Sequence, residues 1–175
     1  MKLFYYSKSK THNRSDTDNL IKKSIEKYCG ETSPQYFPIL RTSEGKPYIE
    51  GNPLYIGVSH TDDIVVIGVS DSAFGIDCEN ISRKTARSFE IAKKYFSQKE
   101  FEYIYPSGYK IGNTDEDLRF LEIWVKKEAY VKYLGTGLAD ISKYDILSVD
   151  GEFEKVNHVD NLIYIYKPTK MGKKD

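Results

Sequence analysis

Cysteine, net charge and long apolar runs are all scarce in this sequence of 175 residues. The two cysteines, Cys29 and Cys78, are far apart and lack metal-ligand spacing, which disfavours a disulfide framework and favours a reducing compartment. The apolar run from Leu3 to Tyr6 is too short for a signal peptide, and no later run could span a bilayer. We therefore expect a cytoplasmic protein with no membrane partner.

The charges balance, with 26 lysines and arginines against 26 aspartates and glutamates. A net charge of zero gives no global indication of nucleic acid as a partner, so any charge-based function is local. Apolar residues make up 39% of the chain and aromatic residues 14%, which is enough for a packed core and disfavours disorder. The length suits one compact domain, or two small halves that share a core.

The predicted elements follow the order strand, helix, strands and then strand, helices, strands. We expect strands at residues 2–7, 54–59, 64–70, 73–79, 144–149, 152–156 and 162–167, and helices at residues 15–29, 82–95, 97–105 and 115–134. Two capping boxes, Ser15 with Asp18 and Ser97 with Glu100, support two of the helix starts. The pattern predicts an α+β fold with two similar halves, residues 1–72 and 73–175, in one compact unit.

Turn signals give the expected strand pairing. Residues 54–59 and 64–70 form an antiparallel hairpin, which the strand at 73–79 extends into a meander. Asp150-Gly151 is a strong hairpin turn between the strands at 144–149 and 152–156.

Residues 74–80 read Phe-Gly-Ile-Asp-Cys-Glu-Asn, a short strand that ends in two carboxylates. Side chains alternate along a strand, so Asp77 and Glu79 project together while Ile76 and Cys78 point the other way. Two adjacent acids repel one another unless a cation lies between them. That cation could be a metal or an ammonium, or the charges could simply be solvated.

The longest predicted helix carries Leu121, Trp124, Glu128 and Lys132 within one stripe at the helical period. A solvated glutamate–lysine pair one turn apart is the ordinary interpretation of Glu128 and Lys132. The single tryptophan on the same stripe weakens that interpretation, because this face should be packed.

Together, the strand and the helix supply three carboxylates: Asp77, Glu79 and Glu128. Mg²⁺ prefers oxygen ligands and typically takes a few carboxylates together with substrate phosphates. With Lys127 and Lys132 nearby, the set suits a metal-bound pyrophosphate.

These two stretches, residues 75–79 and 124–132, resemble the signature motifs G-[IV]-D-x-E and W-x-x-K-E-[AS]-x-x-K of the 4'-phosphopantetheinyl transferases. Residues 45–48, 58–61, 96–100 and 135–138 are also similar to segments of that family. The order and spacing resemble the surfactin-synthetase-activator (Sfp) type rather than the short trimeric holo-acyl-carrier-protein-synthase type. The resemblance implies a 4'-phosphopantetheinyl transferase-like fold of two pseudo-repeated halves, with antiparallel sheets, packed helices and the active site at the junction.

The resemblance also implies an activity, the transfer of 4'-phosphopantetheine from coenzyme A to a serine of an acyl or peptidyl carrier protein. The product is the holo carrier of fatty acid, polyketide or nonribosomal peptide synthesis, and 3',5'-ADP is released. Asp77, Glu79 and Glu128 match the residues that hold Mg²⁺ on the pyrophosphate. Glu128, or a water that it orients, matches the base, and Lys132 matches a residue that offsets phosphate charge.

Five residues are implied in binding coenzyme A. Ser59 and His60 match contacts to its 3'-phosphate, Lys46 resembles a pyrophosphate or adenine-side contact, and Arg14 is similar to a further phosphate-binding arginine. Lys127 completes the set. The structural alternatives are a turn-forming histidine for His60 and an ordinary Gly-Lys-Pro turn for Lys46.

The sequence departs from the family pattern near its start, where the basic segment that helps bind the 3'-phosphate is reduced to Lys8 and Lys10. A set of basic residues could meet an acidic carrier helix or form a solvated helix face: Arg83, Lys84, Arg87, Lys93 and Lys94. Two pseudo-repeated halves in one chain would make a monomer sufficient.

Two other classes of protein compete with the transferase. The first is a catalytically weak homologue that only binds coenzyme A or the carrier, which the intact Asp77, Glu79, Glu128 and Lys132 disfavour. The second is an unrelated metal-dependent phosphohydrolase, for which the sequence lacks a supporting cluster of histidines and aspartates.

Overall fold

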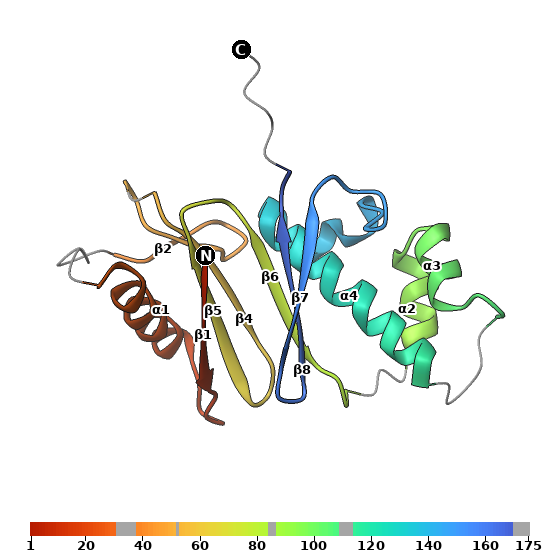
Figure 1. The fold of residues 1–175 in the computed structure, drawn as a ribbon, viewed down its shortest axis with the longest axis horizontal. Helices are drawn as coiled ribbons and strands as arrows, with labels where there is room; N and C mark the ends of the chain where they lie inside the picture. The colour runs from red at the N-terminus through yellow and green to blue at the C-terminus, as the bar shows by residue number, and fades with distance from the viewer. Residues whose placement is uncertain (31–37, 52, 84–86, 109–113, 170–175) are drawn as a thin grey trace, which may run out of the picture.

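The structure is a computed structural model that describes residues 1–30, 38–51, 53–83, 87–108 and 114–169. Two three-stranded antiparallel sheets lie beside one another at the centre, with one helix on one flank and the remaining helices on the other (Figure 1). This confirms the mixed fold with antiparallel sheets. The division near residue 73 and the repetition of one half by the other stay predictions.

The first sheet has the order β1-β5-β4, with β1 at Lys2–Ser7, β4 at Tyr55–His60 and β5 at Ile64–Ser70. The predicted hairpin of β4 and β5 is confirmed. Helix α1, Arg14–Cys29, covers this sheet by burying Ile21 and Ile25 against it. A small ribbon of β2, Leu40–Arg41, and β3, Pro47–Tyr48, brings the Gly45-Lys46 turn to the same side of the molecule as β4.

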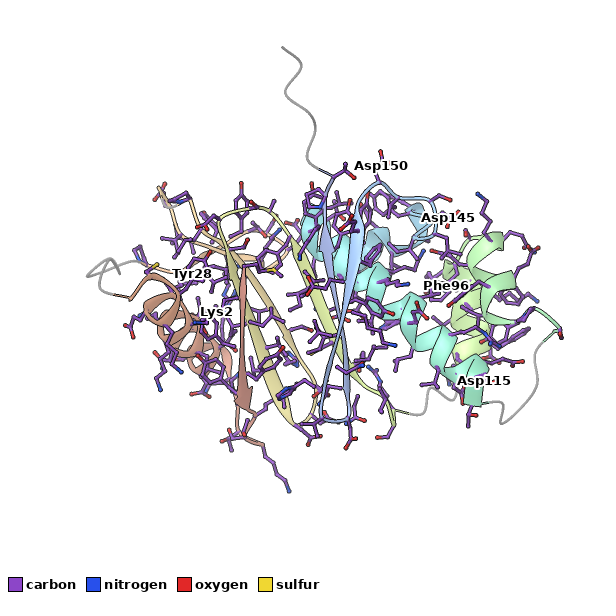
Figure 2. The ribbon with its side chains drawn as sticks, in the orientation of Figure 1. Lys2, Tyr28, Phe96, Asp115, Asp145 and Asp150 are labelled. Carbon is purple, nitrogen blue, oxygen red and sulfur yellow. The ribbon has the colours of Figure 1, made fainter. Side chains whose placement is uncertain are left out.

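The second sheet has the order β6-β8-β7, with β6 at Gly75–Asn80, β7 at Glu152–His158 and β8 at Asn161–Lys167. Helix α4, Thr114–Leu134, packs along β6 and β8, while α2, Ser88–Tyr95, and α3, Gln98–Ile104, pack on its far side. Phe96 lies between α4 and these two helices (Figure 2), where it stacks on Phe120. A 3₁₀ helix, η2 at Leu138–Lys143, follows α4.

The predicted meander is wrong, because β6 pairs with β8, the last strand, and not with β5. β6 instead meets the first sheet through side chains. A Cβ atom at Gly57 or Gly68 would overlap Phe74, so these two glycines provide the room in which that side chain packs. The two sheets are therefore joined by packing rather than by a continuous hydrogen-bond ladder.

The hairpin predicted at Asp150-Gly151 is also wrong. Residues 144–149 form no strand, because side chains satisfy their backbone groups: Glu100 accepts from the N–H of Ile146, and Lys127 donates to the carbonyl of Tyr144. The hairpin that forms is that of β7 and β8, which turns at residues 159–160.

Two helix starts differ from the prediction. Asn13 and Asp16, not Ser15 and Asp18, form the capping box of α1. Helix α2 is described from Ser88 onwards, while Ser82 lies in a turn, where the Asn80 side chain accepts from its N–H and its hydroxyl. Residues 84–86 of the predicted helix lie outside the described residues. The Ser97–Glu100 capping box and the span of α4 are confirmed.

Candidate active site

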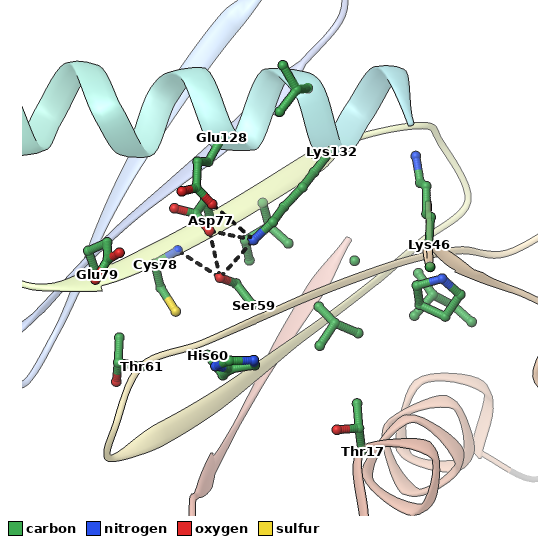
Figure 3. A pocket seen from close by; sticks show the side chains of 18 of the residues that line it. Thr17, Lys46, Ser59, His60, Thr61, Asp77, Cys78, Glu79, Glu128 and Lys132 are labelled. Carbon is green, nitrogen blue, oxygen red and sulfur yellow. Dashed lines mark hydrogen bonds and ion pairs between the residues drawn. The ribbon is translucent and has the colours of Figure 1, made fainter. Parts of the chain in front are cut away.

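A cavity of about 880 Å³ lies between β4, β6 and α4, with α1 and the Gly45-Lys46 turn completing its walls. That volume is in the range of small-molecule and cofactor sites. Figure 3 shows the side chains that converge on it. Eight of the predicted site residues line it: Arg14, Lys46, Ser59, His60, Asp77, Glu79, Glu128 and Lys132.

Asp77 is the most buried acid of the cavity, with 3% of its side chain exposed. Lys132 places its Nζ 2.5 Å from Oδ1 of Asp77, and the Ser59 hydroxyl donates to the same oxygen over 2.8 Å (Figure 3). Ser59 Oγ also accepts the N–H of Cys78, so β4 and β6 are tied together at this point. The second oxygen of Asp77, Oδ2, is buried and has no hydrogen-bond partner among the described residues.

Glu128 lies one helical turn before Lys132, with its Oε2 3.9 Å from the lysine Nζ. Burial, together with the negative charges of Asp77 and Glu79, raises the pKa of Glu128 to about 7, although Lys132 opposes the shift. The carboxyl group therefore exchanges a proton near neutral pH. Burial by itself would lower the pKa of Lys132, but Asp77 and Glu128 outweigh it and the pKa is raised, so the ammonium stays charged.

The interpretation of Glu128 and Lys132 as a solvated surface pair does not hold. Only 14% of the Glu128 side chain is exposed. Earlier on the same stripe, Leu121 is buried and Trp124 stacks on Phe120. This face of α4 is packed, as the tryptophan indicated.

Glu79 is turned towards Arg83, with which it forms an ion pair. Burial raises the pKa of Glu79, and the nearby Asp77 adds to the shift despite the opposing charge of Arg83. Within the described ranges, no three histidine, cysteine, aspartate or glutamate side chains are arranged so that they could hold a metal ion. Mg²⁺ binding by Asp77, Glu79 and Glu128 stays a prediction.

Further basic side chains line the cavity. Lys46 donates to the carbonyl of Tyr133 over 2.9 Å, and burial lowers its pKa. His60 Nδ1 lies 3.2 Å from Nζ of Lys8, and burial, followed by the charge of Lys8, lowers the pKa of the histidine. Lys8, one of the two lysines to which the basic segment is reduced, therefore lines the cavity.

Lys127 lies away from the cavity. It is 1% exposed and its Nζ lies 2.8 Å from both carboxylate oxygens of Glu100, which is fully buried. Its neighbour Glu128 faces the cavity because successive residues on a helix point about 100° apart. The structure therefore does not bring Lys127 together with the other predicted coenzyme A contacts, and its ammonium pairs with Glu100 instead.

Arg41 also lines the cavity, although it was not among the site residues predicted from the sequence. It forms an ion pair with Asp18 and donates to the carbonyl of Gly45, which braces the turn that carries Lys46. The only signal was its position shortly before the Gly-Lys-Pro turn. Cys78, which was expected to point away from Asp77 and Glu79, lies in the core, and burial raises the pKa of its thiol to about 12.

A buried acid–lysine cluster beside a cavity lined by basic side chains suits a ligand that carries phosphate groups. The comparison with family models agrees with this class, because the model of the 4'-phosphopantetheinyl transferase superfamily matches residues 73–170. That match covers more than half of the chain and includes β6, α4 and the whole second sheet. The chain belongs to the 4'-phosphopantetheinyl transferase superfamily.

Several curated relatives carry the same description. The chain is 30% identical over 138 residues to 4'-phosphopantetheinyl transferase Sfp of Bacillus subtilis strain 168, an alignment that covers 77% of this chain and 57% of the relative. It is 30% identical over 94 residues to 4'-phosphopantetheinyl transferase gsp of Aneurinibacillus migulanus, covering 54% of this chain and 36% of the relative. The chain thus spans about a third to somewhat over half of the length of these relatives, and the Sfp-type resemblance is confirmed.

The described helices include none that is long and apolar enough to cross a membrane.

Proposed function

We propose that the protein transfers the 4'-phosphopantetheine group of coenzyme A to a serine hydroxyl of an acyl or peptidyl carrier protein and releases 3',5'-ADP. The observation that carries this proposal is the cluster of Asp77, Glu128 and Lys132. These residues come from the two motifs that resemble the family's signatures, and they meet at one cavity. On this proposal the active site lies at the junction of two pseudo-repeated halves, and a single copy of the chain is sufficient.

Glu128 is the proposed base. In the metal-free protein its pKa is about 7, in the range suited to a general base near neutral pH, and it would take the proton of the carrier serine directly or through a water that it orients. The serine oxygen then forms a bond to the phosphorus that bears the pantetheine group, the bridging P–O bond breaks, and its electron pair leaves with 3',5'-ADP. Lys132 offsets the negative charge that builds up on the phosphate oxygens.

The acids fit a hard divalent cation in their donor chemistry. Asp77 Oδ2 is a buried carboxylate oxygen without a partner among the described residues. The pKa of Glu128 is raised first by burial and then by the negative charges of Asp77 and Glu79. Mg²⁺ bound to Asp77, Glu79 and Glu128 would polarise the pyrophosphate and neutralise charge. Closing such a site requires Glu79 to leave Arg83.

The basic wall of the cavity is the proposed site of the nucleotide part of coenzyme A. Lys8, His60 and Arg14 supply donors for the 3'-phosphate, and Lys46 lies nearer to α4, where the pyrophosphate would pass. Ser59 is engaged with Asp77, so on this proposal it orients the acid rather than binding the 3'-phosphate directly.

The test is to incubate the full chain with a panel of apo carrier proteins, coenzyme A and Mg²⁺, and to measure the mass of each carrier. The proposal predicts a mass gain equal to one phosphopantetheine on at least one carrier, lost when Mg²⁺ is chelated. Binding of coenzyme A without any mass gain would identify the weak binding homologue instead. Hydrolysis of coenzyme A without carrier modification would indicate a phosphohydrolase.

A further inference from the structure

The cavity already contains a cation at Asp77. The Nζ atom of Lys132 lies 2.5 Å from Oδ1 of Asp77 and 3.9 Å from Oε2 of Glu128, so the ammonium sits between two of the three acids. A carboxylate as buried as that of Asp77 needs a compensating charge. Figure 3 shows Lys132 reaching this place from α4, with its third contact to Ser59.

The third acid, Glu79, pairs with a second basic side chain. Arg83, in the turn after β6, forms an ion pair with Glu79. The arginine side chain is 58% exposed and the glutamate side chain 14%, so the arginine can leave into solvent while the acid stays in the cavity. Each of the acids on β6 is thus neutralised by a different basic side chain of the same polypeptide.

A divalent metal cannot simply be added to this arrangement. Mg²⁺ binds its oxygen ligands directly, at about 2.0–2.1 Å. The ammonium on Oδ1 of Asp77 and the guanidinium on Oε1 of Glu79 would both repel the metal ion, and each occupies one oxygen of its carboxylate. The absence of a three-ligand group within the described part of the chain agrees with this competition.

We propose that Lys132 and Arg83 are resident counter-ions, which hold the acids in the metal-free protein and are displaced by a divalent cation. Lys132 is 36% exposed and its flexible stem lets the released ammonium turn towards the cavity, where an anionic ligand would receive it. Metal alone therefore binds weakly, because it must break two ion pairs. This inference rests on the proposed metal site, but it concerns the protein without coenzyme A.

The experiment is a titration of the metal-free full chain with Mn²⁺, followed by electron paramagnetic resonance, without coenzyme A and above neutral pH. Lys132→Met keeps the length of the side chain and removes its charge, and it should tighten Mn²⁺ binding by about fivefold or more. Arg83→Met should tighten it in the same direction. Lys143→Met is the matched control, because Lys143 pairs with Asp140 on η2, outside the cavity, and its loss changes the net charge equally.

Unchanged or weaker Mn²⁺ binding by both Lys132→Met and Arg83→Met would overturn the inference. It would also be overturned if the control Lys143→Met tightened Mn²⁺ binding as much as these two variants do. If Lys132→Met does not fold without metal, Arg83→Met decides, since Arg83 is largely exposed. A carrier mass gain in the transfer assay combined with unchanged Mn²⁺ affinities would reject the counter-ion role and leave the transferase proposal intact. Tightened Mn²⁺ binding without any carrier mass gain would reject the transferase instead.

Discussion

At the scale of single residues, the chemistry of the cavity depends on how its charged side chains are buried and paired. The motifs identify Asp77, Glu128 and Lys132 from the sequence, because their types and spacing resemble those of a known family. Their ionisation depends on burial and on neighbours from distant parts of the chain, such as Ser59 beside Asp77. No sequence pattern reports these neighbours, so neither the pKa of Glu128 nor the partner of Lys127 could be predicted from the sequence.

The raised pKa of Glu128 has a consequence for stability. In the metal-free protein this pKa is about 7, against 4.5 for an ordinary glutamate. Between these values the folded state binds a proton that the unfolded state does not, so the free energy of unfolding falls as the pH rises from 4.5 to about 7. The glutamine of Glu128→Gln does not titrate, so the free energy of unfolding of this variant does not show this fall.

We expect metal-free Glu128→Gln to be more stable than the wild type by roughly 1–3 kcal/mol above pH 7, with the difference shrinking towards acidic pH. Urea unfolding followed by the fluorescence of Trp124, the only tryptophan, measures both proteins. A difference that stays constant with pH, or that grows towards acidic pH, would contradict the assigned pKa.

At the scale of elements, α4 connects the site to the rest of the second half. One face presents Glu128 and Lys132 to the cavity, while Lys127 anchors the helix to α3 and to the segment after η2. The start of α3 and the length of α4 were predictable, since capping and periodicity are local. The ion pair of Lys127 with Glu100, which anchors α4 to α3, was not predictable, because the two residues are far apart in the sequence.

The anchor gives a prediction for stability. Glu100→Gln leaves the Lys127 ammonium buried without its counter-charge, which should lower the free energy of unfolding by about 3 kcal/mol. Glu102→Gln is the matched control on the same helix, because Glu102 is exposed and accepts from the Gln98 side chain, and it should change stability by about 0.5 kcal/mol or less. Urea denaturation measures both; a loss for Glu100→Gln no larger than for the control would show that the pair is not needed.

The contact between β6 and α4 gives a second prediction. A Cβ atom at Gly75 would overlap the carbonyl oxygen of Ala129, so Gly75→Ala must push the strand away from the helix. Asp77 would then shift relative to Lys132, and we expect both a lower melting temperature and slower transfer. Ser72→Ala, in the exposed turn before β6, is the control that should change neither. Wild-type behaviour of Gly75→Ala would mean that this close approach does not position the acid.

At the scale of the whole molecule, local elements were predictable and long-range pairing was not. β1, the β4–β5 hairpin and α4 follow from alternation and helical periodicity. The pairing of β6 with β8 joins strands separated by α2, α3, α4 and β7, and no local pattern encodes such a partner. The same folding brings Arg41, Lys8 and His60 from the first sheet's side to the acids of the second.

The central claim is that Glu128, which α4 presents to the cavity beside the acids of β6, acts as the base in the proposed transfer. The most direct test compares the wild type, Glu128→Gln and Glu122→Gln in the carrier mass assay with coenzyme A and Mg²⁺. Glu122 is the matched control, because it lies on the same helix but pairs with Lys126 and Tyr103 outside the cavity. We predict that the wild type and Glu122→Gln modify the carrier at similar rates, and that Glu128→Gln, folded by circular dichroism, is slower by about a hundredfold or more. A near-normal rate for folded Glu128→Gln would contradict the account.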